Sequence, residues 1–255
     1  MDKKIISKLT LGTHQFFDPS KRMSISEIKN IISCANHNKI NWLDTADQYG
    51  NTFCEQFIGE FCKKNNYNFK IATKIGQLDN FKTSMLQTNI DNCLKRLKKD
   101  ALDICYFHSG SNKQFFNESY WTILNKNLEI GKIKKIGLSI KSSLVKKSDF
   151  TQVLSFKKYN ITCLNIMFNP LFQFSEKIFD FCHENNIKIF IRVPFAKNNV
   201  FKISNKTKII KKIKLIQNLN YENNILSWIK KKTNCNSIVF GVSKIEQLKK
   251  IIFNL

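Results

Sequence analysis

The chain has 255 residues, of which 42% are hydrophobic and 24% are charged, a composition typical of a soluble globular domain. No run of about 18 apolar residues occurs, so the sequence predicts no membrane-spanning helix. Lys and Arg number 42 against 19 Asp and Glu, which gives a formal net charge of +23. The lysines are spread along the chain beside abundant Asn and Ile, as an A/T-rich genome would encode, so we expect neither a nucleic-acid nor a membrane partner.

The N-terminal segment and the cysteines bear on the compartment. Residues 1–13 carry lysines but no apolar stretch before a small-residue cleavage site, so we expect a cytoplasmic protein. Eight cysteines are present, none in a C-x-x-C pair and none clustered with His at zinc spacing. We therefore expect reduced, mostly buried thiols and no metal site. The sequence indicates no particular oligomeric state.

Strand-like apolar runs alternate with helical patterns along the chain. They lie at 9–13, 40–44, 69–74, 102–107, 133–138, 161–167, 187–193 and 236–240. Helical patterns start at Ser24, where Glu27 completes a capping-box pattern, and recur at 53–66, 82–98, around 121–128, at 144–156, around 178–182, and at 207–219, 222–232 and 243–253, with a polar loop at 196–206. The spacing of the apolar residues in the helical patterns at 53–66 and 82–98 predicts that Phe53 and Met85 face the core. The repeat of about 30 residues predicts a (β/α)8 TIM barrel, with one domain over 1–255.

Three successive strand-like runs end in a residue that carries chemistry. Asp44 ends the second run, Lys74 the third and His108 follows the fourth, while Tyr49 lies five residues after Asp44. A buried carboxylate is costly unless a cation pairs with it, and Lys74 is the natural partner of Asp44. Since the carboxyl ends of the strands carry the active site in (β/α)8 barrels, we predict that these four residues meet at one mouth.

Seven stretches carry a recognisable pattern over nearly the whole chain. They are LTLGT at 9–13, LDTADQYG at 43–50, IATK at 71–74, LKRLKKDALDICYFH at 94–108, GKIKKIGLS at 131–139, NIMFNPLFQFSEKIFDFCHENNIKIFIRVPF at 165–195 and IVFGVSKIEQLKKII at 238–252. In this order they resemble the aldo-keto reductases, and the sixth is most similar to a compact bacterial branch often linked to sugar or surface-polysaccharide genes. The resemblance implies NAD(P)H-dependent reduction of a small-molecule aldehyde or ketone to an alcohol.

The resemblance implies a role for each strand-end residue. Tyr49 is the general acid, and Lys74 lowers the pKa of Tyr49 by stabilising the phenolate. Asp44 holds the Lys74 ammonium, and His108 orients the carbonyl. Singly, Tyr49 is more often a rim aromatic, Lys74 a solvated strand end and His108 a core histidine. Their joint presence favours the catalytic interpretation.

Eight residues match positions that hold a nicotinamide dinucleotide in the family. Ser139 and Asn165 are expected to contact the nicotinamide end, and the turn at 241–243 with the helix that follows is expected to receive phosphate on backbone N–H groups. The resemblance and the local lysines favour NADP(H), with NAD(H) as the alternative. The predicted cofactor-binding residues are Gly12, Thr13, Ser139, Asn165, Arg192, Gly241, Ser243 and Gln247.

Several of these positions depart from the family pattern. Ser139 is followed by Ile140 where the family often has Asn, and Asn165 stands in place of a frequent Gln. Gln247 and Ile251 stand where Arg and Asn often contact the adenosine end. The intact catalytic group favours an active reductase, with a sugar-derived carbonyl as one candidate substrate. The changed cofactor contacts favour the alternative, a catalytically weak barrel that acts as a cofactor-binding or regulatory protein.

Overall fold

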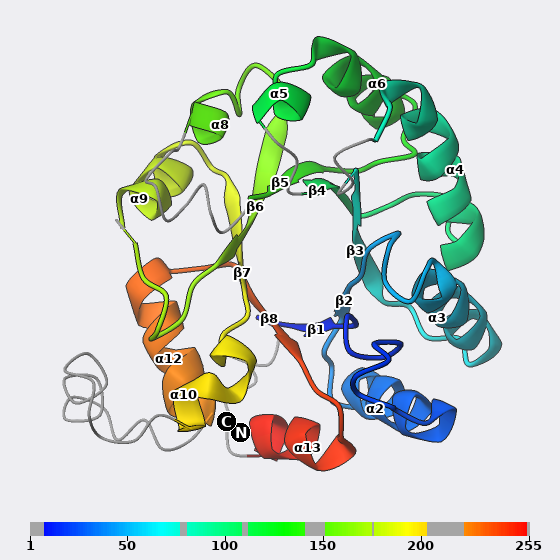
Figure 1. Ribbon diagram of the computed structural model, residues 1–255, viewed down its shortest axis with the longest axis vertical. Coiled ribbons are helices and arrows are strands. Elements are labelled where there is room, and N and C mark those ends of the chain that lie inside the picture. Colours follow the sequence, from blue (N-terminus) through cyan, green and yellow to red (C-terminus); the bar gives the residue numbers. More distant parts are fainter. Residues whose placement is uncertain are drawn as a thin grey trace.

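Eight parallel strands form one closed barrel in sequence order, β1 to β8 (Figure 1). The computed structural model describes residues 8–76, 81–108, 112–140, 151–174, 176–202 and 222–253. Each strand pairs with the next and β8 pairs with β1, so that Gly12 lies beside both Asp44 and Gly241. The strands are β1 (Leu9–Gly12), β2 (Trp42–Asp44), β3 (Lys70–Ile75), β4 (Ile104–His108), β5 (Ile136–Ser139), β6 (Ile161–Met167), β7 (Lys188–Arg192) and β8 (Ser237–Gly241).

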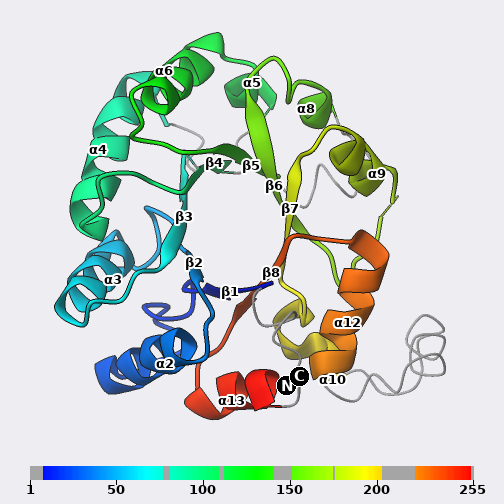
Figure 2. The same cartoon turned by 180° about the vertical axis from the view of Figure 1, so that it is seen from behind.

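Helices surround the barrel, and the view from behind shows the same ring (Figure 2). They are α2 (Ile25–His37), α3 (Phe53–Lys64), α4 (Leu86–Leu97), α5 (Asn112–Phe115), α6 (Glu118–Glu129), α8 (Thr151–Leu154), α9 (Lys177–Glu184), α10 (Asn199–Lys202), α12 (Glu222–Thr233) and α13 (Ile245–Phe253), with 3-10 helices η1 (Thr83–Met85) and η2 (Ala196–Asn198). The predicted (β/α)8 architecture is therefore confirmed.

All eight predicted strands overlap observed strands, and the run at 161–167 coincides with β6. The polar loop predicted at 196–206 is wrong over 196–202, which forms η2 and α10. Burial of Val200 and Phe195 in the core explains this, because an apolar contact favours an ordered turn of helix there. The helix predicted at 207–219 and the first part of the one at 144–156 lie outside the described residues.

The start of α2 shows how two helices are tied together at the end of the barrel. Ser24 is the N-cap, and its hydroxyl accepts the Glu27 N–H at 3.1 Å. The Glu27 carboxylate does not close the predicted capping box among the described contacts but accepts the N–H of Ile245, the first residue of α13. Glu27 thus caps a helix that is distant in sequence.

The core has two layers, one between barrel and helices and one inside the barrel. The Tyr106 ring fills the interior because Gly137 lacks a side chain, since a Cβ there would lie 2.4 Å from the ring. The predictions for Phe53 and Met85 are wrong, because these side chains are 47% and 48% exposed. Phe53 is the first residue of α3 and Met85 directly precedes α4, and in each case the next residue, Cys54 or Leu86, takes the buried position.

The remaining described features concern cysteines, metals and membranes. All eight cysteines are free thiols, as expected. Within the described ranges, no group of three or more His, Cys, Asp or Glu side chains is arranged to hold a metal ion. No helix in the same ranges has both the length and the apolarity required to cross a membrane.

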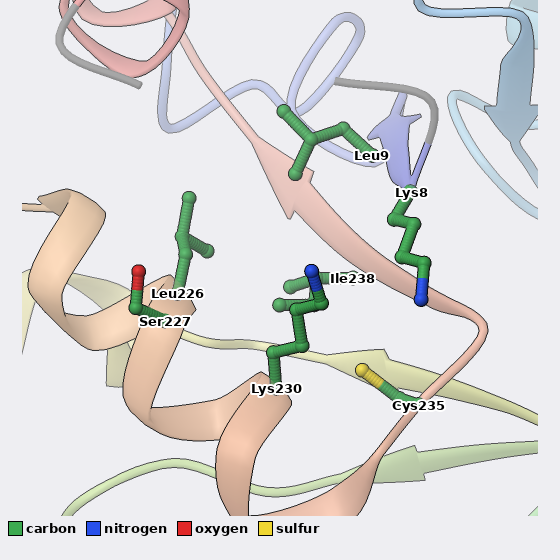
Figure 3. A pocket seen from close by; sticks show the side chains of 7 residues that line it. All are labelled: Lys8, Leu9, Leu226, Ser227, Lys230, Cys235 and Ile238. Atoms are coloured by element: carbon green, nitrogen blue, oxygen red, sulfur yellow. The ribbon is translucent and has the colours of Figure 1, made fainter. Parts of the chain in front are cut away.

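A small hollow lies between α12 and the beginnings of β1 and β8 (Figure 3). It is lined by Lys8, Leu9, Leu226, Ser227, Lys230, Cys235 and Ile238. Leu9 and Ile238 are the first and second residues of their strands, so the hollow belongs to the amino-terminal end of the barrel. It has room for about one water molecule and lies at the opposite end from the predicted catalytic residues.

Candidate active site

The structure brings Asp44, Tyr49 and Lys74 together at the carboxyl end of the barrel. Lys74 lies inside β3, and its Nζ is 2.5 Å from Asp44 Oδ1, at the end of the neighbouring strand β2. The same ammonium donates to the carbonyl oxygen of Thr45 at 2.7 Å and to the Tyr49 hydroxyl at 3.2 Å. Lys74 and Asp44 are 2% and 4% exposed. The three N–H donors of one buried ammonium are therefore all used by this cluster.

The loop after β2 holds Tyr49 in place through backbone contacts. The Asp47 N–H donates to the Lys74 carbonyl at 3.1 Å, which ties the loop to β3, and the Tyr49 N–H donates to the Ala46 carbonyl at 3.1 Å. Gly50 follows with φ +57° and packs against Phe17, where a Cβ would lie 2.5 Å from the Phe17 side chain. A residue with a side chain would be strained there, so Gly50 fixes the turn that aims Tyr49 at Lys74.

Burial and charge act in opposite directions on this cluster. Burial by itself lowers the pKa of Lys74, but the Asp44 carboxylate and the Tyr49 hydroxyl outweigh it and raise the pKa. Burial raises the pKa of Tyr49, and the Lys74 ammonium only partly offsets the rise. Lys74 thus acts on Tyr49 in the predicted direction, but the net shift of the Tyr49 pKa is upward, because burial disfavours the phenolate more strongly.

His108 ends β4 and lies beside Ser139 of β5. Burial, with contributions from Lys74 and Arg192, lowers the pKa of His108 well below its usual value, so the imidazole is neutral near neutral pH. Its Nδ1 is buried and has no hydrogen-bond partner among the described residues. A neutral ring with an unsatisfied nitrogen is suited to a hydrogen bond with a ligand.

His14 also belongs to this mouth, although the sequence reasoning did not single it out. Its ring stands edge-on to the Tyr49 ring, with 4.9 Å between the ring centroids. The signal in the sequence was its place directly after Gly12 and Thr13, at the exit of the first strand. Residues at that position in a barrel strand face the same mouth as the ends of β2 and β3.

Ser139 and Asn165 are neighbours on β5 and β6, as the prediction of a shared cofactor contact requires. Asn165 also has a structural partner, because its Nδ2 donates to Asp44 Oδ2 at 3.2 Å. Its Oδ1 is buried and has no partner within the described part of the chain. Asn165 therefore extends the cluster of Asp44 and keeps one acceptor available to a ligand.

Gly12 and Thr13 contact the strands on either side of β1. The Thr13 N–H and hydroxyl both bond the Asp44 carbonyl oxygen, at 2.9 and 3.1 Å. A Cβ on Gly12 would lie 3.2 Å from Val239 of β8, so glycine permits close contact between the strands. These two residues position the end of β2, and their predicted contact with a cofactor stays a prediction.

The N-terminus of α13 is occupied by the protein's own side chains. Gln247 Oε1 accepts the N–H of Ser243 at 2.8 Å and that of Lys244 at 3.2 Å. Glu27 accepts the next N–H, that of Ile245. The turn after Gly241 was predicted to receive phosphate on these N–H groups, and a phosphate there has to displace Gln247.

A second buried acid, Glu55, lies near the loop that carries Asp47 and Tyr49. Glu55 is fully buried, and its carboxylate accepts from Arg96 at 2.7 and 2.9 Å and from the Thr73 hydroxyl at 2.5 Å. Asp47, on the loop itself, has an Oδ1 with no partner in the described ranges. Burial and the neighbouring Glu55 raise the pKa of Asp47 to about 7.

Arg192, the last residue of β7, reaches across the mouth. Its Nη2 donates to the carbonyl oxygen of Ile140, just beyond β5, at 2.8 Å. Its Nε is buried and has no partner among the described residues. Burial lowers the pKa of Arg192, while Tyr49 and Asp44 oppose that effect, which places the guanidinium within electrostatic reach of these two residues.

Known proteins with similar sequences are aldo-keto reductases and oxidoreductases. The chain is 27% identical over 203 residues to the aldo-keto reductase yakc (NADP(+)) of Schizosaccharomyces pombe, covering 73% of this chain and 56% of that protein. It is 26% identical over 169 residues to the uncharacterized oxidoreductase YqkF of Bacillus subtilis, covering 62% and 52%. The chain spans about half the length of these curated relatives.

Solved structures share the fold. The aldo-keto reductase AKR11C1 from Bacillus halodurans, in its holo form, has a TM-score of 0.76 at 19% identity, covering 96% of this chain and 85% of that chain. The glycerol dehydrogenase AKR11B4 from Gluconobacter oxydans has a TM-score of 0.74 at 18% identity, with the same two coverages of 96% and 85%. The profile of the Aldo/keto reductase family matches residues 8–255. With this match over nearly its whole length, the chain belongs to the aldo/keto reductase family.

Proposed function

We propose that this protein reduces an aldehyde or ketone to an alcohol with a reduced nicotinamide dinucleotide. The observation that carries the proposal is the single buried Lys74 ammonium that contacts both Asp44 and the Tyr49 hydroxyl. A phenol held by an ammonium, with a neutral histidine at the same mouth, is suited to give a proton to a carbonyl oxygen.

The roles of the residues follow from their protonation states. Because burial raises its pKa, Tyr49 keeps its proton at neutral pH and is a donor. When it gives that proton to the carbonyl oxygen, Lys74 stabilises the phenolate left behind, and Asp44 holds Lys74. A nicotinamide dinucleotide held beside Ser139 and Asn165 would supply the hydride for the carbonyl carbon, so one hydride and one proton would convert carbonyl to alcohol. Tyr49 then recovers a proton from solvent, and His108 orients the carbonyl oxygen by a hydrogen bond.

The residues at the nicotinamide end fit such a cofactor. The buried Oδ1 of Asn165 lacks a partner among the described residues and can accept an N–H of the nicotinamide carboxamide. Ser139 lies beside Asn165 on the next strand. These two residues are proposed to hold that end, as the family resemblance also suggests.

The adenosine end determines which dinucleotide is preferred, and we propose NADP(H). Lys244 at the start of α13 and the name of the S. pombe relative support this preference. Gln247 and Glu27 oppose it, because they occupy N–H groups of α13 and Glu27 adds a negative charge there. The preference for NADP(H) over NAD(H) is therefore expected to be small.

The Tyr49→Phe variant tests the reaction, since it keeps the ring and removes only the hydroxyl. Turnover of a panel of small aldehydes and sugar aldehydes at saturating NADPH is expected to fall by roughly 10²–10⁴-fold. Tyr67→Phe is the matched control, because the Tyr67 hydroxyl donates to the hydroxyl of Ser33 in helix α2, outside the barrel. Cofactor binding, followed by fluorescence of Trp42, Trp121 and Trp228, should survive in both. A Tyr49→Phe variant as fast as wild type would refute the mechanism.

The second candidate is a barrel that binds cofactor and acts as a regulatory protein. The occupied N-terminus of α13 favours it, because fewer donors are open to the cofactor phosphates. Cofactor binding without turnover of any carbonyl in the panel would support this candidate. Binding of neither NADPH nor NADH would contradict both.

A further inference from the structure

Arg192 is held so that its charge faces the catalytic mouth. It ends β7, where it pairs with Met167 of β6 and Val239 of β8. Its Nη2 bonds the Ile140 carbonyl, which lies beyond the end of β5. Since β6 stands between β5 and β7, the side chain crosses the carboxyl end of β6. One backbone acceptor thus fixes the guanidinium in place.

The charge of Arg192 has no counter-ion in the described part of the chain. No described carboxylate lies within ion-pair distance, and the buried Nε–H has no acceptor. Asp44 is the acid whose charge reaches Arg192, but Lys74 and Asn165 already use both of its oxygens. In this half-buried side chain, a buried N–H donor without an acceptor is costly unless a ligand supplies one.

Two cations, Arg192 and Lys74, act on the residues at this mouth. Arg192 acts on the pKa of both Tyr49 and His108, so it lies near the proposed proton donor and the carbonyl-orienting group. Burial, Lys74 and Lys197 lower the pKa of His14 against the opposing effect of Asp18. Because Asp44 pairs with Lys74, Arg192 is the described cation at this mouth whose charge a negative ligand would balance.

The nicotinamide ring does not supply that negative charge. It is neutral when reduced and positive when oxidised, so an adjacent guanidinium gains no ion pair from it. The cofactor phosphates are expected beside α13, which follows Gly241, whereas the Arg192 side chain points the other way, toward β5. The remaining ligand at this mouth is the carbonyl substrate.

We propose that the carbonyl substrate carries an oxyanion close to the carbonyl and that the Arg192 guanidinium binds it. The N–H donors of a guanidinium fit the oxygens of a carboxylate or a phosphate. The inference rests on the proposed reductase function and names its substrate class. It also reassigns Arg192, which the sequence predicted as a cofactor contact, to the substrate.

Matched substrate pairs test the proposal with the whole protein and saturating NADPH. Pyruvate is compared with methyl pyruvate, and glyceraldehyde 3-phosphate with glyceraldehyde, so that the two arms separate carboxylate from phosphate. Wild type is expected to show a higher kcat/KM for the anionic member of at least one pair. Arg192→Met is expected to reduce that preference by about 10–100-fold, the usual effect of a lost charge-assisted hydrogen bond.

Two further variants separate recognition from folding. Arg192→Lys keeps the charge and should retain part of the preference, because lysine lacks the planar fork. Lys188→Gln removes a cation from the other end of β7, where it is exposed, and should leave the preference intact. Circular dichroism confirms that each variant is folded. If Arg192→Met loses affinity for NADPH but keeps the preference for the anionic substrate, Arg192 binds the cofactor and the proposal is wrong.

A direct measurement of anion binding tests the anion site independently of turnover. Titration calorimetry of the NADPH complex with each anion should detect binding to wild type and at least tenfold weaker binding to Arg192→Met. Anion binding without turnover would refute the proposed reaction and uphold the anion site. Turnover of neutral carbonyls with no anion preference and no Arg192-dependent binding would uphold the reaction and refute the anion site. Neither turnover nor binding would refute both.

Discussion

Replacing Lys74 by Met removes the buried cation that three acceptors share. The Asp44 carboxylate, 4% exposed, then keeps only the Asn165 amide at 3.2 Å among the described side-chain contacts. Removing one partner of a buried ion pair costs about 3–5 kcal/mol, because the other charge is left uncompensated. For a chain of this size, about 2–4 °C of Tm is lost per kcal/mol, so Tm should fall by roughly 6–20 °C.

A double-mutant cycle with Asp44→Asn isolates the pair from the general cost of substitution. The variant with both changes has no buried charge at this point, so it should be more stable than Lys74→Met alone. Lys132→Met is the matched control, because Lys132 pairs with Asp91 at 2.6 Å where both are well exposed. That control should change stability by less than about 1 kcal/mol.

Thermal and urea denaturation followed by circular dichroism provide the measurements for this cycle. Carbonyl reduction should fall in Lys74→Met as well, and its effect should not add to that of Tyr49→Phe, because the two residues act as one unit. If Lys74→Met has the same Tm as the Lys132→Met control, or if the double variant is the least stable of all, the buried-pair argument is wrong.

Two other predictions concern acids outside the catalytic group. Asp47, with its pKa raised to about 7 by burial and Glu55, stabilises the fold fully below its unfolded pKa of 3.8 and loses that contribution as the pH rises toward 7. The free energy of unfolding of Asp47→Asn, relative to that of wild type, should therefore rise by up to about 4 kcal/mol from mildly acidic to neutral pH. Urea denaturation measures this difference, and parallel pH profiles of the two proteins would contradict the prediction. Glu27→Gln should raise NADPH affinity relative to NADH severalfold by removing the charge beside α13, measured by fluorescence titration against the exposed control Glu129→Gln, and an unchanged ratio would exclude Glu27 as a determinant.

The strands were predictable because a buried parallel strand leaves a continuous apolar run bounded by polar residues. In β6, which is buried on both faces for most of its length, prediction and structure coincide at 161–167. In β5 the run began three residues early, at 133, because Ile133 is buried and pairs with Leu102 in a single bridge before the strand proper. Burial alone does not say where a ladder begins.

Helix faces were harder to predict where the apolar pattern is ambiguous. In α3 the buried face includes Cys54, Glu55 and Gly59 as well as Ile58, while Phe53 is exposed. Gly59 lets α3 approach α4 so closely that a Cβ would lie 2.1 Å from the Arg96 carbonyl oxygen. Glu55 is buried only because Arg96 and Thr73 satisfy it, and such a long-range partner leaves no local signal.

The convergence of the catalytic candidates was predictable from strand ends, but their energetics were not. That Asp44 and Lys74 would meet followed from their places on adjacent strands of a barrel. The upward net shift of the Tyr49 pKa depends on how completely the folded loop excludes water, which no spacing encodes. The Ile140 carbonyl that anchors Arg192 is likewise a contact across an intervening strand, visible only once the barrel closes.

The substitution of Asn for the family's frequent Gln at position 165 does not disconnect the site. The shorter amide reaches Asp44 Oδ2 at 3.2 Å, so a line of hydrogen bonds runs from Asn165 through Asp44 and Lys74 to the Tyr49 hydroxyl. Asn165 Oδ1 remains buried and unsatisfied among the described residues. A cofactor amide that bonds this oxygen is then linked through the same side chain to the acid that holds Lys74. Under the proposed function, cofactor binding and the proton donor are coupled through Asp44, so changes at Asn165 should alter both at once.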